Sequence, residues 1–327
     1  MRILVTGATG KVGQTCIAEI LQSSNFENAS IVALCHNRTL NPTDRIEVIK
    51  GSIADQKTVT KALEGITHVI HLATCKETPE EVMDVTVKGL FWLLEGCRKS
   101  STFKHFILIG GDASMGHFFY DHSIPVTETQ KHTAYPGCYA LSKVLEEVML
   151  EQYQIQYNFP GTCLRAPWIM EKDDFKFSLS FGKDVFGGPV WRDLIDKNEA
   201  DQYYKDGVVP LMLDSEDAPI KRNFVHVDDL VTAILCSMLH PTPAKGQTFN
   251  ICMDEPVDYE QVSKYLKETR NIGSVPVKTT YCSTWLDNTK AKFLLDWRPK
   301  VSLYELIDRS WNYKRNEDDV RKIWYPG

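Results

Sequence analysis

A tyrosine and a lysine stand four residues apart in the segment "YALSK" at positions 139–143, within a run that has the pattern of an amphipathic helix. Residues at this spacing share one face of a helix and lie about 5–6 Å apart at their Cβ atoms. An ammonium group beside a phenol would lower the tyrosine pKa from about 10, so that Tyr139 could exchange protons near neutral pH with the help of Lys143. The same spacing also arises by chance, so the pair alone does not separate an acid–base site from an ordinary helix face.

The segment "TGATGKVG" places three glycines between the first apolar run and the first helical pattern. A tight strand-to-helix turn favours glycine, and a backbone that approaches a pyrophosphate leaves no room for a Cβ atom. The helix that follows offers free N–H groups and the positive end of its dipole to phosphates. The segment therefore predicts a dinucleotide site. The expected contacts are Gly7, Thr9, Gly10, Lys11, Val12 and Gly13.

The elements that must position these residues alternate in the first half of the chain. Short apolar runs such as "RILVTG", "SIVALC" and "KHFILIGG" alternate with amphipathic stretches, which is typical of a parallel sheet covered on both faces. After about residue 167 the chain becomes rich in Asp, Lys, Gly and aromatic residues. We predict an α/β fold with a doubly wound parallel sheet of Rossmann type and a smaller, irregular C-terminal substrate domain. The expected division is 1–166 plus about 222–250 for the dinucleotide, and about 167–221 plus 251–327 for the substrate.

The composition excludes several classes of protein. The net charge of −6 over 327 residues argues against a nucleic-acid binder. The sequence contains no uninterrupted apolar stretch of about 18 residues, so we expect no membrane span. The N-terminus "MRILVTGATG" lacks the pattern of a signal peptide. The nine scattered cysteines form no C-x-x-C pair, so we expect neither disulfides nor a metal site. Reduced thiols favour a cytoplasmic location.

Several motifs appear together in the order found in one superfamily. The G-x-x-G-x-x-G spacing, with "YALSK" about 130 residues later, resembles the short-chain dehydrogenase/reductases. "RNFVHVDDL" at 222–230, "TFNIC" and "AKFLLDWRPKVSLYELI" resemble the extended branch of that superfamily, which contains nucleotide-sugar epimerases, dehydratases and reductases. The resemblance implies that Tyr139 is the acid–base group at the substrate hydroxyl or carbonyl. It also implies that Lys143 holds the nicotinamide ribose.

The adenosine end of the cofactor is predicted to lie after the second and third strands. About 20–25 residues beyond the glycine turn, an Asp or Glu would bind a ribose 2′-hydroxyl, but His36, Asn37 and Arg38 stand there. An arginine pairs well with a 2′-phosphate, so NADP is favoured over NAD, although Arg38 could equally be a solvated loop residue. In "GSIAD", the resemblance places Ser52 where the family has an adenine-binding Asp, and Ile53 against the ring.

The nicotinamide end follows from the resemblance alone. "HLAT" resembles the strand end that lies against the cofactor, which implies contacts from Leu72, Ala73 and Thr74. "APWI" stands where the family lines the nicotinamide pocket, which implies contacts from Pro167 and Ile169.

Two positions depart from the family pattern. Gly110 and Gly111 replace the serines of the usual S-S-A run, so that Asp112 or, preferably, Ser114 would supply the missing hydrogen bond. Thr86 replaces a frequent Asn and could still organise a water molecule. These departures leave open an altered mechanism or a non-catalytic paralogue.

The substrate is the least defined part of the prediction. The resemblance implies that Arg222 and Arg298 contact a substrate diphosphate, with Asp112 as a further contact, whereas Arg222 could instead pair with a nearby acid. We expect an NAD(P)-dependent sugar or nucleotide-sugar epimerase or dehydratase. The alternatives are an NADP-dependent carbonyl reductase on a small sugar-like compound and a dinucleotide-binding protein without turnover. The resemblance also suggests a homodimer packed through the helices that begin near residues 80 and 139.

Overall fold

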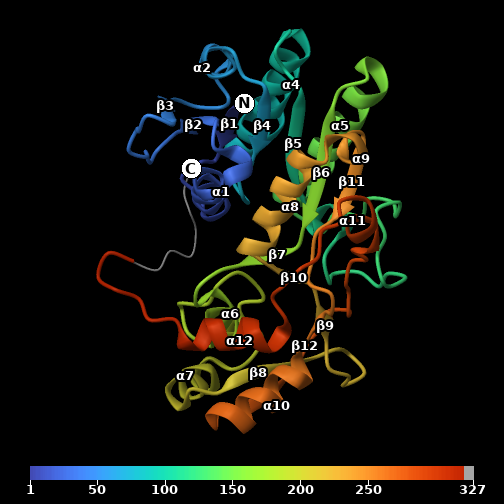
Figure 1. Cartoon of the computed structure of the whole chain (residues 1–327). Helices are drawn as coiled ribbons and strands as arrows, with labels where there is room; N and C mark the ends of the chain where they lie inside the picture. Colours follow the sequence, from blue (N-terminus) through green and yellow to red (C-terminus); the bar gives the residue numbers. More distant parts are fainter. Residues whose placement is uncertain (320–327) are drawn as a thin grey trace.

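A seven-stranded parallel sheet forms the centre of the computed structural model, which describes residues 1–319 (Figure 1). The strands lie in the order β11-β6-β5-β4-β1-β2-β3, and each neighbouring pair is parallel. The predicted α/β fold with a doubly wound sheet is confirmed. The strands are β1 (Arg2–Thr6), β2 (Ser30–Cys35), β3 (Ile46–Lys50), β4 (His68–His71), β5 (His105–Gly111), β6 (Gly161–Ala166) and β11 (Gln247–Asn250).

Alternate side chains of the central strands enter two different cores, one on each face of the sheet. On β1, Ile3 and Val5 pack into one core and Leu4 into the other. Helices α1 and α8 cover the first core, whereas α2, α4 and α5 cover the second. Because both faces are covered, the strands are apolar along nearly their whole length. The helices are α1 (Lys11–Gln22), α2 (Gln56–Ala62), α4 (Gly89–Lys99), α5 (Cys138–Tyr157) and α8 (Val227–Leu239).

The order of the strands creates a switch point at the carboxyl ends of the central strands. β1 lies between β2 and β4, so the chain reverses its direction of travel across the sheet after β3. In such sheets, ligands bind outside the carboxyl ends of the strands at this switch point. The glycine turn follows β1 and the segment "LAT" follows β4, so the fold brings the predicted cofactor segments to the same edge.

The C-terminal part lies below the sheet in Figure 1 and has its own core around Phe175, Trp191 and Phe224. Three short two-stranded sheets frame it, pairing β7 with β10, β8 with β13 and β9 with β12. Its strands are β7 (Trp168–Met170), β8 (Val209–Leu213), β9 (Lys221–Arg222), β10 (Phe224–His226), β12 (Val257–Asp258) and β13 (Ser274–Lys278). Its helices are α6 (Asp174–Ser178), η4 (Trp191–Asp193), α7 (Lys197–Asp206), α10 (Tyr259–Arg270) and α12 (Leu303–Asn312).

One segment that the sequence assigned to the substrate region packs with the sheet instead. Ala291, Leu295 and Trp297 belong to the core under α1 and α8, and the Trp297 indole N–H donates to the Asp229 carbonyl oxygen at 3.0 Å. We therefore propose the predicted division with residues 289–297 moved to the dinucleotide-binding part; residues 320–327 lie outside the described residues. The remaining elements are η1 (Ser24–Phe26), α3 (Pro79–Val82), the π-helix η2 (Met83–Lys88), η3 (Asp112–Met115), α9 (Pro241–Ala244) and α11 (Thr289–Leu294).

Two histidines buried in the sheet predict loss of stability in acid. His71 and His105 are each 1% exposed, and burial lowers the pKa of each to about 3. Between pH 6.5 and that value the unfolded chain binds protons that the folded chain does not, so the free energy of unfolding falls as the pH falls. Each such group removes about 1.4 kcal/mol per pH unit below 6.5.

The His105→Gln variant isolates one of these two contributions. Between pH 7.5 and 5.5, urea unfolding should show a total loss of stability that is smaller by about 1.4 kcal/mol in the variant than in the wild type. Glutamine retains a donor for the Thr162 hydroxyl, which lies 2.8 Å from the His105 ring in the native structure. An identical loss in both proteins would contradict the assignment of a neutral His105.

Candidate active site

The glycine turn after β1 forms a cradle that a larger residue would fill. Gly7 has a φ of +65°, which favours glycine, and a Cβ atom there would lie 2.9 Å from the Ala73 backbone nitrogen. A Cβ atom on Gly13 would lie 2.4 Å from the Gly7 carbonyl oxygen. Gly10 precedes α1 without a side-chain cap, and no acidic residue stands in the first turn. The uncapped N–H groups of that turn fit a dinucleotide pyrophosphate.

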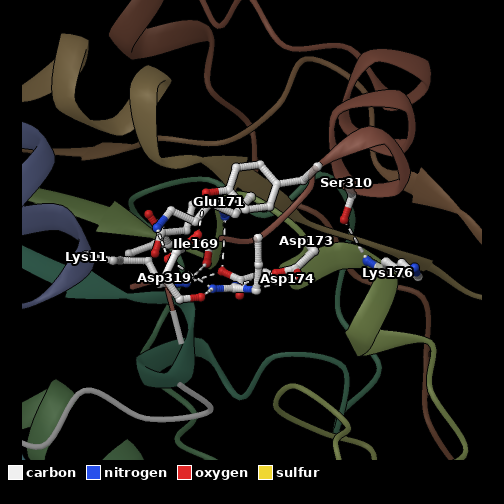
Figure 2. Close-up of polar contacts among 11 residues, drawn as sticks. Lys11, Ile169, Glu171, Asp173, Asp174, Lys176, Ser310 and Asp319 are labelled. Carbon is white, nitrogen blue, oxygen red and sulfur yellow. Dashed lines mark hydrogen bonds and ion pairs between the residues drawn. The ribbon is translucent and has the colours of Figure 1, made fainter. Parts of the chain in front are cut away.

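The Lys11 side chain has a role that its position in the turn did not predict. Figure 2 shows it reaching from α1 toward Ile169 and Asp174. Its ammonium forms an ion pair with the buried Asp174 carboxylate and donates to the Ile169 carbonyl oxygen at 3.1 Å. The Lys11 backbone can still contact a phosphate, but its side chain joins the dinucleotide-binding part to the segment after β7.

The predicted adenosine contacts differ in their surroundings. His36 and Asn37 are exposed after β2, whereas Arg38 folds back so that its guanidinium donates to the Thr9 carbonyl oxygen at 2.5 Å. Arg38 therefore stands beside the glycine turn. The Ser52 hydroxyl oxygen accepts from the Ala54 N–H at 3.2 Å. Ile53, which the sequence assigned to the adenine ring, is only 6% exposed and packs into the core beside Gly89.

The predicted nicotinamide contacts lie at the ends of β4 and β6. The backbone N–H groups of Leu72 and Ala73 both donate to the Thr6 hydroxyl oxygen, at 3.1 and 3.2 Å, which holds β4 against β1. Thr74 is half-buried and donates to the Cys75 carbonyl oxygen. Pro167 is buried and Ile169 is half-buried, directly after β6 and within β7.

The structure brings Tyr139 and Lys143 together at the start of α5. The Lys143 ammonium lies 5.8 Å from the centre of the Tyr139 ring and donates to the Ile109 carbonyl oxygen at 3.2 Å. Tyr139 is half-buried, and the Lys76 ammonium lies 4.1 Å from the same ring centre. Burial opposes the charge on Lys143, but Glu146 and Tyr139 beside it raise its pKa above the ordinary value. A charged ammonium therefore stands beside the phenol at neutral pH.

The Ser114 hydroxyl, predicted as a catalytic donor, is engaged elsewhere. Ser114 is fully buried, and its oxygen lies 2.9 Å from both the Gly111 carbonyl oxygen and a Glu147 carboxylate oxygen. Glu147 also pairs with Arg165 at 2.7 Å and with His132 at 3.1 Å. Burial would raise the pKa of Glu147, but the His132 and Arg165 contacts lower it to about 2. This placement supports a structural role for Ser114 rather than a catalytic one.

The Thr86 hydroxyl is likewise engaged in a hydrogen bond within the protein. It is fully buried within the π-helix η2, and its hydroxyl oxygen accepts from the Cys75 N–H at 3.0 Å. Its oxygen fixes the segment after β4, which leaves little capacity to organise a water molecule.

A Cβ atom would meet different neighbours at each of the two glycines that end β5. A Cβ atom on Gly110 would lie 2.8 Å from the Cys163 sulfur, so any side chain there would displace the core. A Cβ atom on Gly111 would lie 3.9 Å from Lys143 Cδ and 3.7 Å from the Ala166 carbonyl oxygen, which are ordinary contacts. Gly111 is therefore the position that faces the Lys143 side chain.

The fold should tolerate a hydroxyl introduced at position 111. We expect Gly111→Ser to fold normally and to raise kcat by up to about tenfold, the value of one added neutral hydrogen bond to the reacting oxygen. The matched variant Gly110→Ser should lose about 1–3 kcal/mol of stability by overpacking. Thermal unfolding and turnover of both variants test this. Equal destabilisation of the two would show that Gly111 lacks the predicted space.

Arg222, a predicted phosphate contact, lies between aromatic rings. Its guanidinium carbon is 3.9 Å from the centre of the Phe118 ring and 4.4 Å from that of Trp168. The side chain is 3% exposed and donates to the Gly188 carbonyl oxygen and the Tyr259 hydroxyl. Within residues 1–319 it forms no ion pair with a carboxylate, so the alternative of a neighbouring acid is not observed. A buried cation of this kind is suited to an anionic ligand.

A small polar pocket lies beside Arg222. Its other lining residues are Asp112, His117, Phe118, Asn223 and Thr284. The predicted substrate contact Asp112 pairs with His117 at 2.7 Å, and the His117 ring stacks on Tyr135 with centres 5.1 Å apart. Arg298, by contrast, is exposed and donates to the Lys292 carbonyl oxygen, without a hydrogen bond to the pocket residues in the described part of the chain.

Several residues at the site were not predicted from the sequence. Glu77 accepts the Tyr139 N–H at 3.2 Å and the Tyr135 hydroxyl at 3.3 Å. His117 and Tyr135 belong to a loop that carries no recognisable motif, and only tertiary packing brings them to the pocket. The one signal available for Glu77 was its place in "HLATCKE", three residues after the predicted cofactor segment "HLAT".

The parallel sheet and the glycine turn at its switch point define the fold that this chain shares with solved short-chain dehydrogenase/reductases. A solved short-chain dehydrogenase/reductase from Agrobacterium tumefaciens with bound NAD superposes with a TM-score of 0.76 at 20% identity, covering 95% of this chain and 96% of that one. The sequence model described as "NAD dependent epimerase/dehydratase family" matches residues 3–175, and the chain belongs to this family.

Two named relatives show how varied the chemistry of similar proteins is. A UDP-glucose 4-epimerase from Erwinia amylovora is 24% identical over 339 residues, covering 96% of this chain and 98% of the relative. A dihydroflavonol 4-reductase from Zea mays is 23% identical over 177 residues, covering 48% of this chain and 49% of the reductase. This chain thus matches about half the length of the maize enzyme.

Proposed function

We propose that this protein catalyses NAD(P)-dependent hydride transfer at a hydroxyl-bearing or carbonyl carbon of a sugar or nucleotide sugar, as an epimerase or dehydratase would. The observation that carries the proposal is the Lys143 ammonium held beside the Tyr139 ring at the cofactor edge of the sheet. Full-length similarity to a UDP-glucose 4-epimerase supports the substrate class.

Different residues of the chain have different roles in the proposed reaction. The nicotinamide, when bound, supplies the acceptor and donor of hydride. Tyr139 takes the proton from the substrate hydroxyl and returns it later, while Lys143 stabilises the phenolate and holds the nicotinamide ribose. Gly7, Gly13 and the first turn of α1 hold the pyrophosphate.

Arg222 is the proposed anchor for the anionic part of the substrate. The rings of Phe118 and Trp168 hold the guanidinium in place, and the adjoining pocket joins Arg222 to Asp112 and His117. A substrate diphosphate or carboxylate would supply the counter-charge that the guanidinium lacks.

A second candidate is an NADP-dependent carbonyl reductase, which Arg38 favours. No acidic residue stands among residues 36–43 after β2, and the Arg38 guanidinium stands beside the glycine turn, where it could pair with a 2′-phosphate. NADP is accordingly the favoured cofactor of the proposal.

The fate of the cofactor separates the two candidates. The purified protein is assayed for dinucleotide released on denaturation and for interconversion of UDP-sugar epimers without added cofactor. Retained dinucleotide with epimer exchange supports the epimerase. Stoichiometric consumption of added NADPH, with weaker binding of NADH, supports the reductase. The absence of both turnover and dinucleotide binding under these conditions would contradict the proposal.

The protein is also proposed to work as a homodimer in a reducing compartment such as the cytoplasm. Leu141, Val148 and Ile155 stand at seven-residue spacing on α5 and are 51%, 37% and 69% exposed. Met83 and Phe91 are also exposed, on the elements η2 and α4 that contact α5. All nine cysteines are free thiols. Within residues 1–319, no helix is both long and apolar enough to cross a membrane.

The exposed stripe on α5 predicts the oligomeric state. Light scattering after size exclusion should give the mass of a dimer, and Ile155→Glu should convert it to a monomer, because a charge would be buried in an apolar interface. A monomeric wild type would contradict the prediction, and so would a variant that stays dimeric.

A further inference from the structure

A buried carboxylate lies behind the proposed acid–base pair. Glu146 is fully buried on α5, three residues after Lys143, and its carboxylate oxygen lies 2.7 Å from the Lys143 ammonium. Its other oxygen lies 3.8 Å from Nε2 of His71. Apart from the Lys143 ion pair, neither oxygen has a hydrogen-bond partner among residues 1–319. The proposed function does not use this carboxylate, although it directly contacts the lysine that serves Tyr139.

The hydrogen bonds around His71 fix which of its nitrogens faces Glu146. The Thr6 hydroxyl oxygen accepts two backbone N–H groups, from Leu72 and Ala73, and lies 2.7 Å from His71 Nδ1. The Thr6 hydroxyl therefore donates its proton to His71 Nδ1. The ring proton of the neutral His71 is consequently on Nε2, on the side of Glu146. Burial, with a smaller effect of the Lys143 charge, lowers the pKa of His71 to about 3 and keeps it uncharged.

Lys143 and Glu146 form a close pair of opposite charges. The other ionisable groups that influence them are Tyr139, Glu147 and Cys163, together with Lys76 from the segment after β4. Glu147 is already paired with Arg165 and His132, and the Cys163 thiol is kept neutral by burial. In the described part of the chain, Glu146 is the sole carboxylate within ion-pair distance of Lys143.

We propose that Glu146 is a positioning residue that sets the proton affinity of Tyr139 by opposing the charge of Lys143. The proposal rests on the acid–base role proposed for Tyr139. An ionised Glu146 balances the ammonium and weakens its attraction for the phenolate. A neutral group at the same place leaves the full positive charge to act on Tyr139, which then loses its proton more easily.

Burial raises the pKa of Glu146 to about 6, even though the Lys143 charge opposes this. The carboxylate is therefore mostly ionised at neutral pH and takes up a proton a little below it. The proton affinity of Tyr139 consequently changes with the protonation of Glu146 across this range.

The Glu146→Gln variant removes the charge and keeps the shape. Tyrosinate absorbance is titrated in the protein without added cofactor, and the signal of Tyr139 is the part that is absent in Tyr139→Phe. We expect its midpoint to fall by about one pH unit or more in Glu146→Gln. The acidic limb of kcat for hydroxyl oxidation should move in the same direction. Glu151→Gln, an identical change at an exposed position of α5, should leave both unchanged.

A measurement on the wild type covers the case in which Glu146→Gln fails to fold. Coupling between two sites is reciprocal, so the ionisation of Tyr139 must also change the Glu146 carboxylate. NMR of carboxyl-labelled glutamate should show a second titration step of Glu146 at the Tyr139 midpoint, which Tyr139→Phe removes. A folded Glu146→Gln with an unchanged midpoint, or a wild type without that second step, overturns the proposal. Full turnover by Tyr139→Phe would instead overturn the proposed function, so the two failures are distinguishable.

Discussion

Tyr139→Phe is expected to lower kcat by about 10²–10⁴-fold, the usual contribution of a general acid–base group. The change removes one hydroxyl from a half-buried ring, and no side-chain hydrogen bond of Tyr139 is found within residues 1–319. Folding and dinucleotide binding should therefore remain intact. Stopped assays of sugar turnover and fluorescence titration with NADPH measure the two effects separately.

The matched control is Tyr157→Phe, the same substitution at the last residue of α5, where the ring contacts Arg98 at the surface. It should retain wild-type turnover. If Tyr139→Phe were as active as this control, Tyr139 would be only a residue of the helix face, and the protein would bind dinucleotide without the proposed chemistry.

Arg165→Met is expected to lower the free energy of unfolding by about 3–5 kcal/mol. Arg165 is 2% exposed on β6, and its guanidinium binds the Glu147 carboxylate at 2.7 and 3.2 Å and the Asn250 side-chain oxygen at 3.3 Å. Methionine fills a similar volume but leaves the Glu147 carboxylate buried without its main partner. Urea unfolding at pH 7.5 measures the loss.

The double variant Arg165→Met/Glu147→Leu tests the physical cause. It removes both charges, so it should recover much of the stability lost in the single variant, because replacing a whole buried ion pair costs less than removing one partner. Recovery will be incomplete, since Glu147 also accepts from Ser114 and His132. A double variant that is less stable than Arg165→Met would contradict this account.

At Lys11 the sequence predicted the backbone conformation but not the contacts of the side chain. The glycine spacing correctly indicated a strand, a turn and a helix, because each is a local consequence of apolar periodicity and of a turn that excludes Cβ atoms. The destination of the Lys11 side chain depends on Asp174, which lies 163 residues later, and no local pattern contains that information.

The sequence by itself determined the parallel sheet, the glycine turn after the first strand and the shared helix face of Tyr139 and Lys143, because strand and helix periodicities are properties of neighbouring residues. Only the tertiary structure decided that Gly111 faces Lys143 while Gly110 faces the core, and that the Ser114 hydroxyl is bound to Glu147. It alone placed Arg222 between Phe118 and Trp168 and Glu146 behind Lys143. These contacts join segments that are distant in the chain or depend on which face of an element is buried, and packing of the whole molecule selects them.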